Sequence, residues 1–198
     1  MRYPKEHKAK IRRQILDSAA RLFRTHGYEG VGVDAIMAET GLTAGGFYAH
    51  FPSKEALFAE AVALTLEQSA ARRRLRGRSV GATRRQSQAN PLAKLIDGYL
   101  SRAHRDGVAD GCPLPALTPD VARSGPATRE GYERELRQLL AELETWLPDG
   151  STPQRDRAWA LIAECVGGLM LSRAVNDEQL SDQILRACRQ AAAKICEP

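Results

Sequence analysis

The sequence of 198 residues predicts an all-α protein. Apolar residues recur three and four positions apart through most of the chain, which places them on one face of a helix. Ser, Thr, Asn or Asp residues precede several of these runs, and Gly or Pro residues follow them, as at helix ends. We find no segment that alternates apolar and polar residues as a half-buried strand does. With 43% hydrophobic residues, the chain can bury a core.

The N-terminal part predicts three helices in close succession. The first ends at Gly27, because glycine adopts the left-handed conformation that commonly closes a helix. It carries apolar residues at Ile11, Ile15, Ala19, Leu22 and Phe23. A short second helix over residues 33–37 ends before Gly41. Thr43 can cap a third, which runs to about Phe51 and is barely two turns long.

Pro52 ends this third helix, and Ser53 then opens a longer one. Its apolar residues are Leu57, Phe58, Ala61, Leu64 and, further on, Leu75. Residues 71–90, ARRRLRGRSVGATRRQSQAN, hold seven arginines and no acid. This composition indicates a mobile or loosely helical connector. Either it is a solvated linker, which we favour, or it is an additional arm that contacts phosphates.

The C-terminal part predicts further helices. Asn90 and Pro91 open one that carries Leu92, Leu95, Ile96, Tyr99 and Leu100. Residues 107–126 are rich in Gly and Pro and predict a short helix between bends. Another amphipathic helix runs over about 132–146, and Pro148 closes it. The last two cover about 153–175, capped by Thr152, and about 177–195.

Charge is distributed unevenly along the chain. Residues 1–86 hold 16 Lys and Arg against 8 Asp and Glu, whereas residues 87–198 hold 13 against 16. A basic front indicates contact with a polyanion, and nucleic acid is the first candidate. A solvated basic face is the alternative.

Several classes of protein are excluded by what the chain lacks. No apolar run approaches the roughly 18 residues of a membrane span, and the N-terminus lacks a secretory signal, so we expect a cytoplasmic protein. The cysteines show no metal-binding or disulfide spacing, and the histidines are scattered. These residues are Cys112, Cys165, Cys188 and Cys196, and His7, His26, His50 and His104. We therefore expect no enzyme, no cofactor, no catalytic residue and no metal.

The stretch TGLTAGGFYAHFPSKEALF, residues 40–58, predicts the second half of a helix-turn-helix. Its second helix would enter the major groove of DNA. Ala44, Gly45 and Gly46 would let its leading end approach phosphates and base edges closely. The polar tips of Tyr48, His50 and Lys54 suit phosphate oxygens, while Phe47 and Phe51 would anchor the opposite face in the core.

At these residues the chain resembles the TetR family of transcriptional regulators. Between residues 11 and 57 it has, in order, a Gly-aromatic turn, Val-Asp-x-Ile, Gly-Leu-Thr and Tyr-x-His-Phe-x-x-Lys-Glu. The resemblance implies an N-terminal DNA-binding domain, a helical effector domain and a homodimer on a palindromic operator of double-stranded DNA. Matched by position, DNA would be contacted by Thr43, Tyr48, His50 and Lys54, with Ala44, Gly45 and Gly46 lining the groove.

Two departures from the family pattern stand out. Gly32 occupies a position where relatives usually have Ser or Thr, so it can cap a helix but offers no hydroxyl. Ala44 and Ala49 stand where relatives often have larger polar or basic residues. Apolar contacts, backbone contacts or DNA shape would then matter more for operator choice.

The resemblance also implies roles in the C-terminal part. The last two helices would pair with their copies in a four-helix dimer interface, for which the candidates are Trp159, Val166, Gly167, Met170 and Leu171. An intramolecular core is the alternative. A small-molecule inducer would bind between helices near Tyr99, Leu117, Trp146 and Met170.

Cys112 follows a glycine and resembles the sensor cysteine of one subgroup of the family, some members of which sense electrophiles or oxidants. A helix start at Pro113, together with His104 and Arg105, would favour the thiolate. A small buried hydrophobe is the other interpretation.

We expect three parts: a helix-turn-helix DNA-binding domain over residues 1–52, a connecting helix and Arg-rich linker over 53–89, and an effector-binding and dimerisation domain over 90–198. The function expected is a ligand-responsive regulator, with repression favoured. The alternatives are a thiol-sensing repressor that acts through Cys112 and a basic architectural DNA-binding protein without an effector.

Overall fold

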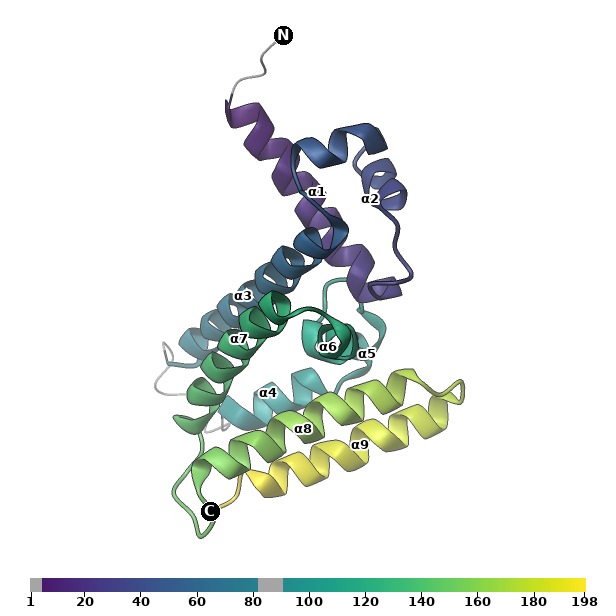
Figure 1. Ribbon diagram of the computed structural model, residues 1–198. Helices are drawn as coiled ribbons and strands as arrows, with labels where there is room; N and C mark the ends of the chain where they lie inside the picture. Colours follow the sequence, from purple (N-terminus) through teal and green to yellow (C-terminus); the bar gives the residue numbers. More distant parts are fainter. Residues whose placement is uncertain (1–4, 82–90) are drawn as a thin grey trace.

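The computed structural model describes residues 5–81 and 91–198 (Figure 1). Over these residues the secondary structure is helical, without strands, which confirms the all-α prediction. The elements are α1 (Lys5–His26), α2 (Val33–Glu39), the 3-10 helix η1 (Ala44–Ala49), α3 (Lys54–Gly81), α4 (Pro91–Tyr99), α5 (Arg102–Asp106), α6 (Pro113–Arg123), α7 (Pro126–Glu144), α8 (Gln154–Arg173) and α9 (Glu178–Ile195).

At one end of the molecule, α1, α2 and η1 form a helix-turn-helix unit (Figure 1). Gly27 closes α1 with φ +73°, as predicted, and Gly41 takes φ +72° in the turn between α2 and η1. The third helix is a 3-10 helix rather than the predicted helix from Thr43 to Phe51. Two successive glycines, Gly45 and Gly46, weaken α-helix formation there.

The long helix α3 connects this end to the rest of the molecule (Figure 1). Ser53 caps it as predicted, since the Ala56 N–H donates to its Oγ at 3.0 Å. The helical backbone continues to Gly81, so the first half of the predicted connector is a regular part of α3. Residues 82–90 and the side chains of residues 71–81 lie outside the described residues, and the phosphate-contacting arm stays untested.

The C-terminal body differs from the prediction mainly at helix ends. Pro153, not Thr152, takes the N-cap position of α8, and α8 ends at Arg173. Helix α9 lies where it was expected, and Asp177 caps it, with Oδ1 accepting from the backbone amides of Gln179 and Leu180. The short helix α5 was not predicted, because RAHRD has too few apolar residues to show a period.

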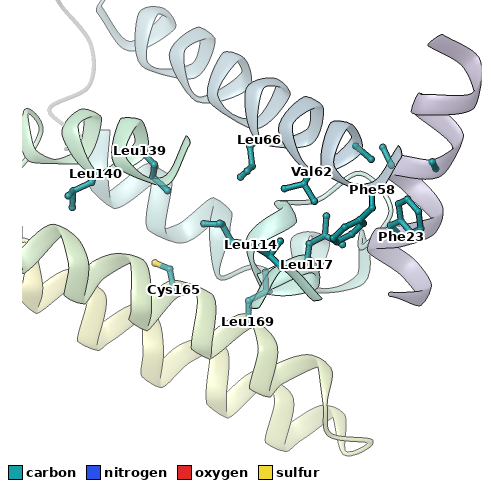
Figure 2. Close-up of a cluster of buried hydrophobic side chains, with 14 of the residues drawn as sticks. Phe23, Phe58, Val62, Leu66, Leu114, Leu117, Leu139, Leu140, Cys165 and Leu169 are labelled. Atoms are coloured by element: carbon teal, nitrogen blue, oxygen red, sulfur yellow. The ribbon is translucent and has the colours of Figure 1, made fainter. Parts of the chain in front are cut away.

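Buried hydrophobic residues form one continuous core through the molecule (Figure 2). Phe23 of α1 and Phe58 of α3 lie at one end, and their rings meet edge to face with centroids 5.2 Å apart. Leu117 of α6 follows, and Cys165 and Leu169 of α8 lie beyond it. The core therefore joins the helix-turn-helix unit to the body without a solvent gap, and the division into three parts stays a prediction. No helix among the described residues is long and apolar enough to cross a membrane.

Candidate functional site

The 3-10 helix η1 buries one side and exposes the other. Phe47 is fully buried, and Phe51 just beyond the helix is 1% exposed, so both anchor η1 in the core as predicted. Tyr48 is 70% exposed. Thr43 and Gly45 are also exposed, whereas Ala44 and Gly46 are partly buried. The helix thus presents a small, flat surface that carries one aromatic side chain.

Two features leave this surface open to a close approach. A Cβ atom added to Gly45 would meet nothing within 4 Å, so the space beside it belongs to solvent. Thr43 stands at the N-cap position, but its hydroxyl makes no capping hydrogen bond, contrary to the predicted cap. The 3-10 turn is closed by the backbone instead, with the Gly46 N–H donating to the Thr43 carbonyl at 3.0 Å. The Thr43 hydroxyl therefore has no capping role in η1.

His50 ends η1 in positively charged surroundings. Its Nδ1 atom is buried and makes no hydrogen bond within the described residues. Burial, and then the charges of Lys8 and Arg12 on α1, lower the pKa of His50. Arg12 itself is bound by Glu60 at 2.6 Å and lies over the Phe51 ring. The end of η1 is therefore electropositive, as a surface that meets phosphates would be.

Lys54, the first residue of α3, has its ammonium 4.1 Å from the centroid of the Tyr28 ring. Tyr28 packs in turn against Phe23 and Phe58. This cation–π contact holds the Lys54 charge at the N-terminus of α3, five residues after the end of η1 in the chain. The sequence predicted a phosphate contact for Lys54 and missed its contact with Tyr28.

The body encloses a cavity of about 390 Å³ between α4, α7 and α8. This volume is in the range of small-molecule sites. Its deeper wall is apolar and consists of Leu114, Leu139, Leu143, Leu161 and Cys165, all buried. The segment from Gly98 to Cys112 supplies the other side, including Tyr99, Ser101, His104 and Asp110.

His104 fixes this second side in place. Its Nδ1 lies 2.7 Å from the Tyr99 carbonyl, and its Nε2 lies 3.0 Å from the Cys112 backbone N–H. A carbonyl can only accept and an amide N–H can only donate, so these two contacts require a neutral ring protonated at Nδ1. His104 thereby ties Tyr99 and Cys112 to the same wall of the cavity.

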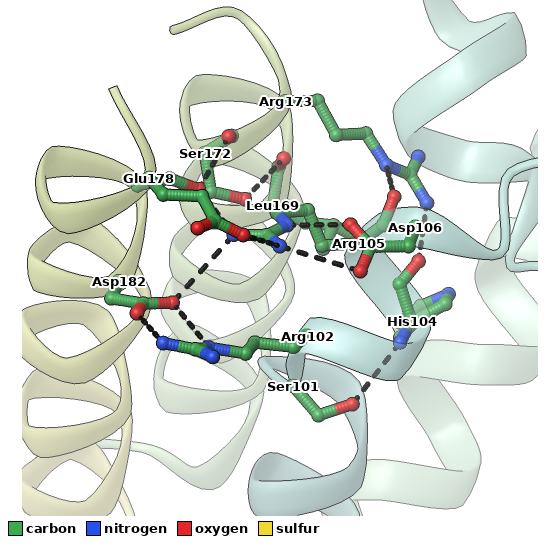
Figure 3. A network of polar contacts seen from close by, with 11 residues as sticks. Ser101, Arg102, His104, Arg105, Asp106, Leu169, Ser172, Arg173, Glu178 and Asp182 are labelled. Atoms are coloured by element: carbon green, nitrogen blue, oxygen red, sulfur yellow. Dashed lines mark hydrogen bonds and ion pairs between the residues drawn. The ribbon is translucent and has the colours of Figure 1, made fainter. Parts of the chain in front are cut away.

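Helix α5 is itself held to the body by a polar network (Figure 3). Arg102 pairs with Asp182 of α9. Arg105 donates to the Ser181 hydroxyl at 2.9 Å. Arg173 of α8 donates to the carbonyls of His104 and Arg105 at 2.6 and 2.9 Å. These contacts fix the cavity wall from behind.

The Tyr99 hydroxyl is buried and makes no hydrogen bond within the described residues. Its ring meets the His104 ring edge on, with centroids 4.6 Å apart. Burial, and then the adjacent Cys112 thiol, raise the pKa of Tyr99 well above its ordinary value. The phenol therefore remains protonated at neutral pH, with the weakly accepting thiol of Cys112 beside its hydroxyl.

The surroundings of Cys112 do not match those predicted for a reactive thiolate. Cys112 is the N-cap residue of α6, but Pro113 and Pro115 have no N–H to offer it. His104 is neutral, and Arg105 is engaged by Asp106 and Ser181. The start of α6, His104 and Arg105 therefore make the electrostatic environment of the Cys112 thiol less positive than the sequence suggested.

The structure brings only part of the predicted effector set to the cavity. Tyr99 and Cys112 line it. Leu117 is 1% exposed in the core and Trp146 packs partly buried against that core, whereas Met170 is 37% exposed. None of these three is on the cavity wall. Helical periodicity marked all of them as apolar but could not tell cavity from core or surface.

The α8–α9 pair exposes large apolar residues, at Trp159, Met170, Leu171 and Leu180. A Cβ at Gly167 would meet nothing within 4 Å, so Gly167 lies on open surface as well. Val166, predicted with this group, instead lines the cavity. Gly168 faces inward, where a Cβ would lie 2.7 Å from Cys188 of α9. Gly168 alone of the two glycines therefore serves the close approach of α9 to α8 within the chain.

Two contacts that the sequence did not reveal join the helix-turn-helix unit to the body. Arg24 of α1 is 8% exposed, and its Nε donates to the Ala109 carbonyl at 2.6 Å. The Tyr28 N–H donates to Asp120 of α6 at 3.0 Å. Ala109 belongs to residues 107–112, and Gly107, Asp110, Gly111 and Cys112 of that loop line the cavity. One loop thus contacts both the cavity and α1.

An exposed helix-turn-helix on a helical body with its own cavity defines a class, the helix-turn-helix DNA-binding regulators. Residues 15–61 match the family described as bacterial regulatory proteins, tetR family. Over these residues the chain is similar to bacterial regulators of the TetR family. No group of three or more His, Cys, Asp or Glu that could hold a metal lies within the described residues.

Curated relatives resemble the chain over only part of its length. It is 48% identical over 52 residues to the HTH-type transcriptional regulator LmrA of Bacillus subtilis, covering 26% of this chain and 28% of that protein. It is 42% identical over 59 residues to the repressor AcnR of Corynebacterium efficiens, covering 30% of each. The chain thus matches less than a third of the length of these relatives.

The fold extends the likeness to the whole chain. The crystal structure of reduced NemR from E. coli superposes with a TM-score of 0.77 over 95% of this chain and 97% of that one, at 18% identity. At that identity the comparison establishes the shared fold, including the helical C-terminal body.

Proposed function

We propose that the protein is a ligand-responsive repressor that binds a palindromic operator as a homodimer and is released when a small molecule occupies the cavity. One observation carries the proposal: the loop 107–112 lines the cavity and also accepts the Arg24 hydrogen bond from α1. Whatever reshapes that wall therefore acts on the helix that supports η1. AcnR, a relative over 59 residues, is a transcriptional repressor.

In the proposed complex η1 lies in the major groove. Ala44, Gly45 and Gly46 form the flat surface against the bases, and Thr43, Tyr48, His50 and Lys54 contact phosphates or base edges. The exposure of Tyr48, the open space beside Gly45 and the charges around His50 support this placement. Since most of these contacts are not bidentate base contacts, DNA shape contributes to specificity.

Specific binding to a palindromic operator requires a dimer, because of the spacing of the major groove along DNA. One helix-turn-helix makes few base contacts, whereas two, held about 34–36 Å apart, reach successive turns of one groove face. The exposed apolar residues Trp159, Met170, Leu171 and Leu180 on α8 and α9 support pairing with a second copy. Occupation of the cavity would favour the dimer geometry in which the two η1 helices no longer fit, a shift of population between two states.

Fluorescence anisotropy tests this proposal directly. A labelled duplex from the region upstream of the protein's own gene should bind in moderate salt at least tenfold more tightly than an unrelated duplex. Leu171→Asp places a charge on a side chain that is 60% exposed and should yield monomers in sedimentation with much weaker operator binding. Ala193→Asp, exposed elsewhere on α9, is the matched control. Equal affinity for both duplexes would indicate an architectural DNA-binding protein.

A second candidate, thiol sensing, is favoured by the position of Cys112. It lies partly exposed on the cavity wall, whereas burial raises the pKa of Cys165 to about 12 and that of Cys188 to about 11. Those two thiols remain protonated and unreactive. If an alkylating agent releases DNA from the parent and from Cys112→Ser to the same extent, thiol sensing through this residue is excluded.

A further inference from the structure

The cavity contains one polar group that the fold leaves without a partner. The Tyr99 hydroxyl is buried and makes no hydrogen bond within the described residues. Its position is not accidental, because the Tyr99 carbonyl is held by His104 and the ring packs edge on against the imidazole. A buried donor without an acceptor costs free energy, and a ligand that supplies the acceptor recovers it.

The other polar groups of the cavity wall are already engaged. Ser101 Oγ accepts from the His104 backbone N–H and donates to the Gly98 carbonyl. Both ring nitrogens of His104 have partners. Ser69 and Asp110 also have interaction partners. A ligand therefore finds one O–H donor here whose neighbour is the Cys112 thiol, a weak acceptor that a carbonyl oxygen can replace. The phenol stays protonated at neutral pH because burial and Cys112 raise its pKa.

The wall offers little to a charged ligand. Among the described residues that line the cavity there is no Lys or Arg, and the single carboxylate, Asp110, is exposed at the mouth. The deeper wall is formed by Leu114, Leu139, Leu143 and Leu161. A charge placed against these side chains would lose its hydration without gaining a partner.

We propose that the cavity binds an uncharged, mainly apolar molecule with one carbonyl oxygen that accepts the hydrogen bond of the Tyr99 hydroxyl. The inference rests on the proposed function in treating this cavity as the effector site. It goes beyond that function by stating the chemical class of the ligand and the residue that selects it.

Three probes of one shape separate the possibilities: β-tetralone, the hydrocarbon tetralin, and tetralin-2-carboxylate. Each is titrated calorimetrically into the full-length protein at pH 7 without DNA. We expect β-tetralone to bind about tenfold more tightly than tetralin, the effect of one satisfied buried donor, and the carboxylate to bind at least tenfold more weakly than the ketone. Equal affinities, a preference for the carboxylate, or no binding of the ketone at its solubility limit would overturn the proposal.

Two tyrosine variants test whether the preference for the ketone over the hydrocarbon depends on the Tyr99 hydroxyl. Tyr99→Phe keeps the ring and removes the hydroxyl, so the affinity ratio of ketone to hydrocarbon should fall to about one while tetralin binds as before. Tyr132→Phe is the matched control, because the Tyr132 hydroxyl lies 2.7 Å from Thr118 Oγ1 and is not on the cavity wall. It should retain the tenfold ratio. A ratio that survives in Tyr99→Phe would contradict the assignment.

The calorimetric titrations test the ligand class, and the DNA-release measurement tests the effector role of the cavity, so either hypothesis can be contradicted without the other. If β-tetralone binds with the expected preference but does not release DNA, the ligand class stands and the effector role of the cavity fails. If the preference is absent and another class of molecule releases DNA, the proposed function stands and the ligand class is overturned.

Discussion

Arg24 and Ala109 are 85 residues apart in the sequence, yet the Arg24 Nε donates to the Ala109 carbonyl at 2.6 Å. The arginine lies near the end of α1, and the carbonyl lies in the loop that forms part of the cavity wall. The contact is almost fully buried on the arginine side. Movement of this loop on ligand binding would therefore shift α1, against which the helix-turn-helix is packed.

Removal of the Arg24–Ala109 contact should weaken the coupling between ligand binding in the cavity and DNA binding by the helix-turn-helix. We expect Arg24→Ala to lower the free energy of unfolding by about 2 kcal/mol, the loss of a charge-assisted hydrogen bond, and to reduce the effect of ligand on DNA affinity about fivefold or more. Arg13→Ala is the control, because Arg13 pairs with Asp17 on the surface of α1. Anisotropy titrations with and without the releasing ligand give the coupling. Undiminished coupling in Arg24→Ala would exclude this route.

Lys54 supplies a test of the phosphate contacts. Replacement by Ala should weaken binding to all duplexes alike and reduce the slope of log affinity against log salt by about one, because one phosphate contact is lost. Loss of the contact with the Tyr28 ring adds only about 0.5–1 kcal/mol of destabilisation. Lys194→Ala removes the same charge from the exposed side of α9 and should leave the slope unchanged. A slope that Lys54→Ala does not change would assign Lys54 to packing alone.

His50 should make the stability depend on pH. Its pKa in the folded protein is lowered, chiefly by burial, so below about pH 6.5 the unfolded chain takes up a proton that the folded chain does not. The stability contribution is therefore present above the unfolded pKa and is lost as the pH falls toward the folded one. Urea unfolding between pH 7 and 5 should show a smaller loss for His50→Gln than for the parent. His26→Gln, exposed at the end of α1, should behave as the parent does.

Two neighbouring glycines of α8 should respond oppositely to the same change. An Ala at position 168 would place its Cβ 2.7 Å from the Cβ and Sγ of Cys188, so Gly168→Ala should destabilise the protein by about 1–3 kcal/mol. At position 167 there is open space, and Gly167→Ala should stabilise the helix by about 0.5–1 kcal/mol. Urea midpoints at one protein concentration compare the two. Similar losses at both positions would place Gly167 in a tight interface as well.

The helices were predictable where local signals are strong. Gly27 and Gly41 have the positive φ angles that only glycine adopts readily, and Ser53 and Asp177 form their caps through their own side chains. Prediction failed where a helix has no apolar period, as in α5, and where backbone geometry decides between two neighbouring residues, as for Thr152 and Pro153. Helix ends depend on contacts that local sequence does not specify.

The candidate sites were predictable to different degrees. Motifs in consecutive residues placed Phe47 in the core and Tyr48 on the surface, because residues on opposite faces of a short helix follow directly from their spacing. The cavity needed residues from six helices, α3 to α8, and a loop, and only Tyr99 and Cys112 were anticipated. A periodic apolar stripe identifies a buried face without telling whether that face meets another side chain or an empty space.

The sequence by itself determined most of the helices, the helix-turn-helix and the resemblance of residues 15–61 to the TetR family, since these depend on residues that are close together in the chain. The tertiary structure alone decided that the Tyr99 hydroxyl lies unpaired in an apolar cavity and that Arg24 reaches the loop beside it. The surroundings of the Tyr99 hydroxyl and the Arg24 contact both depend on groups that are far apart in the sequence. Their energies depend on the packing of whole helices, which no local pattern encodes.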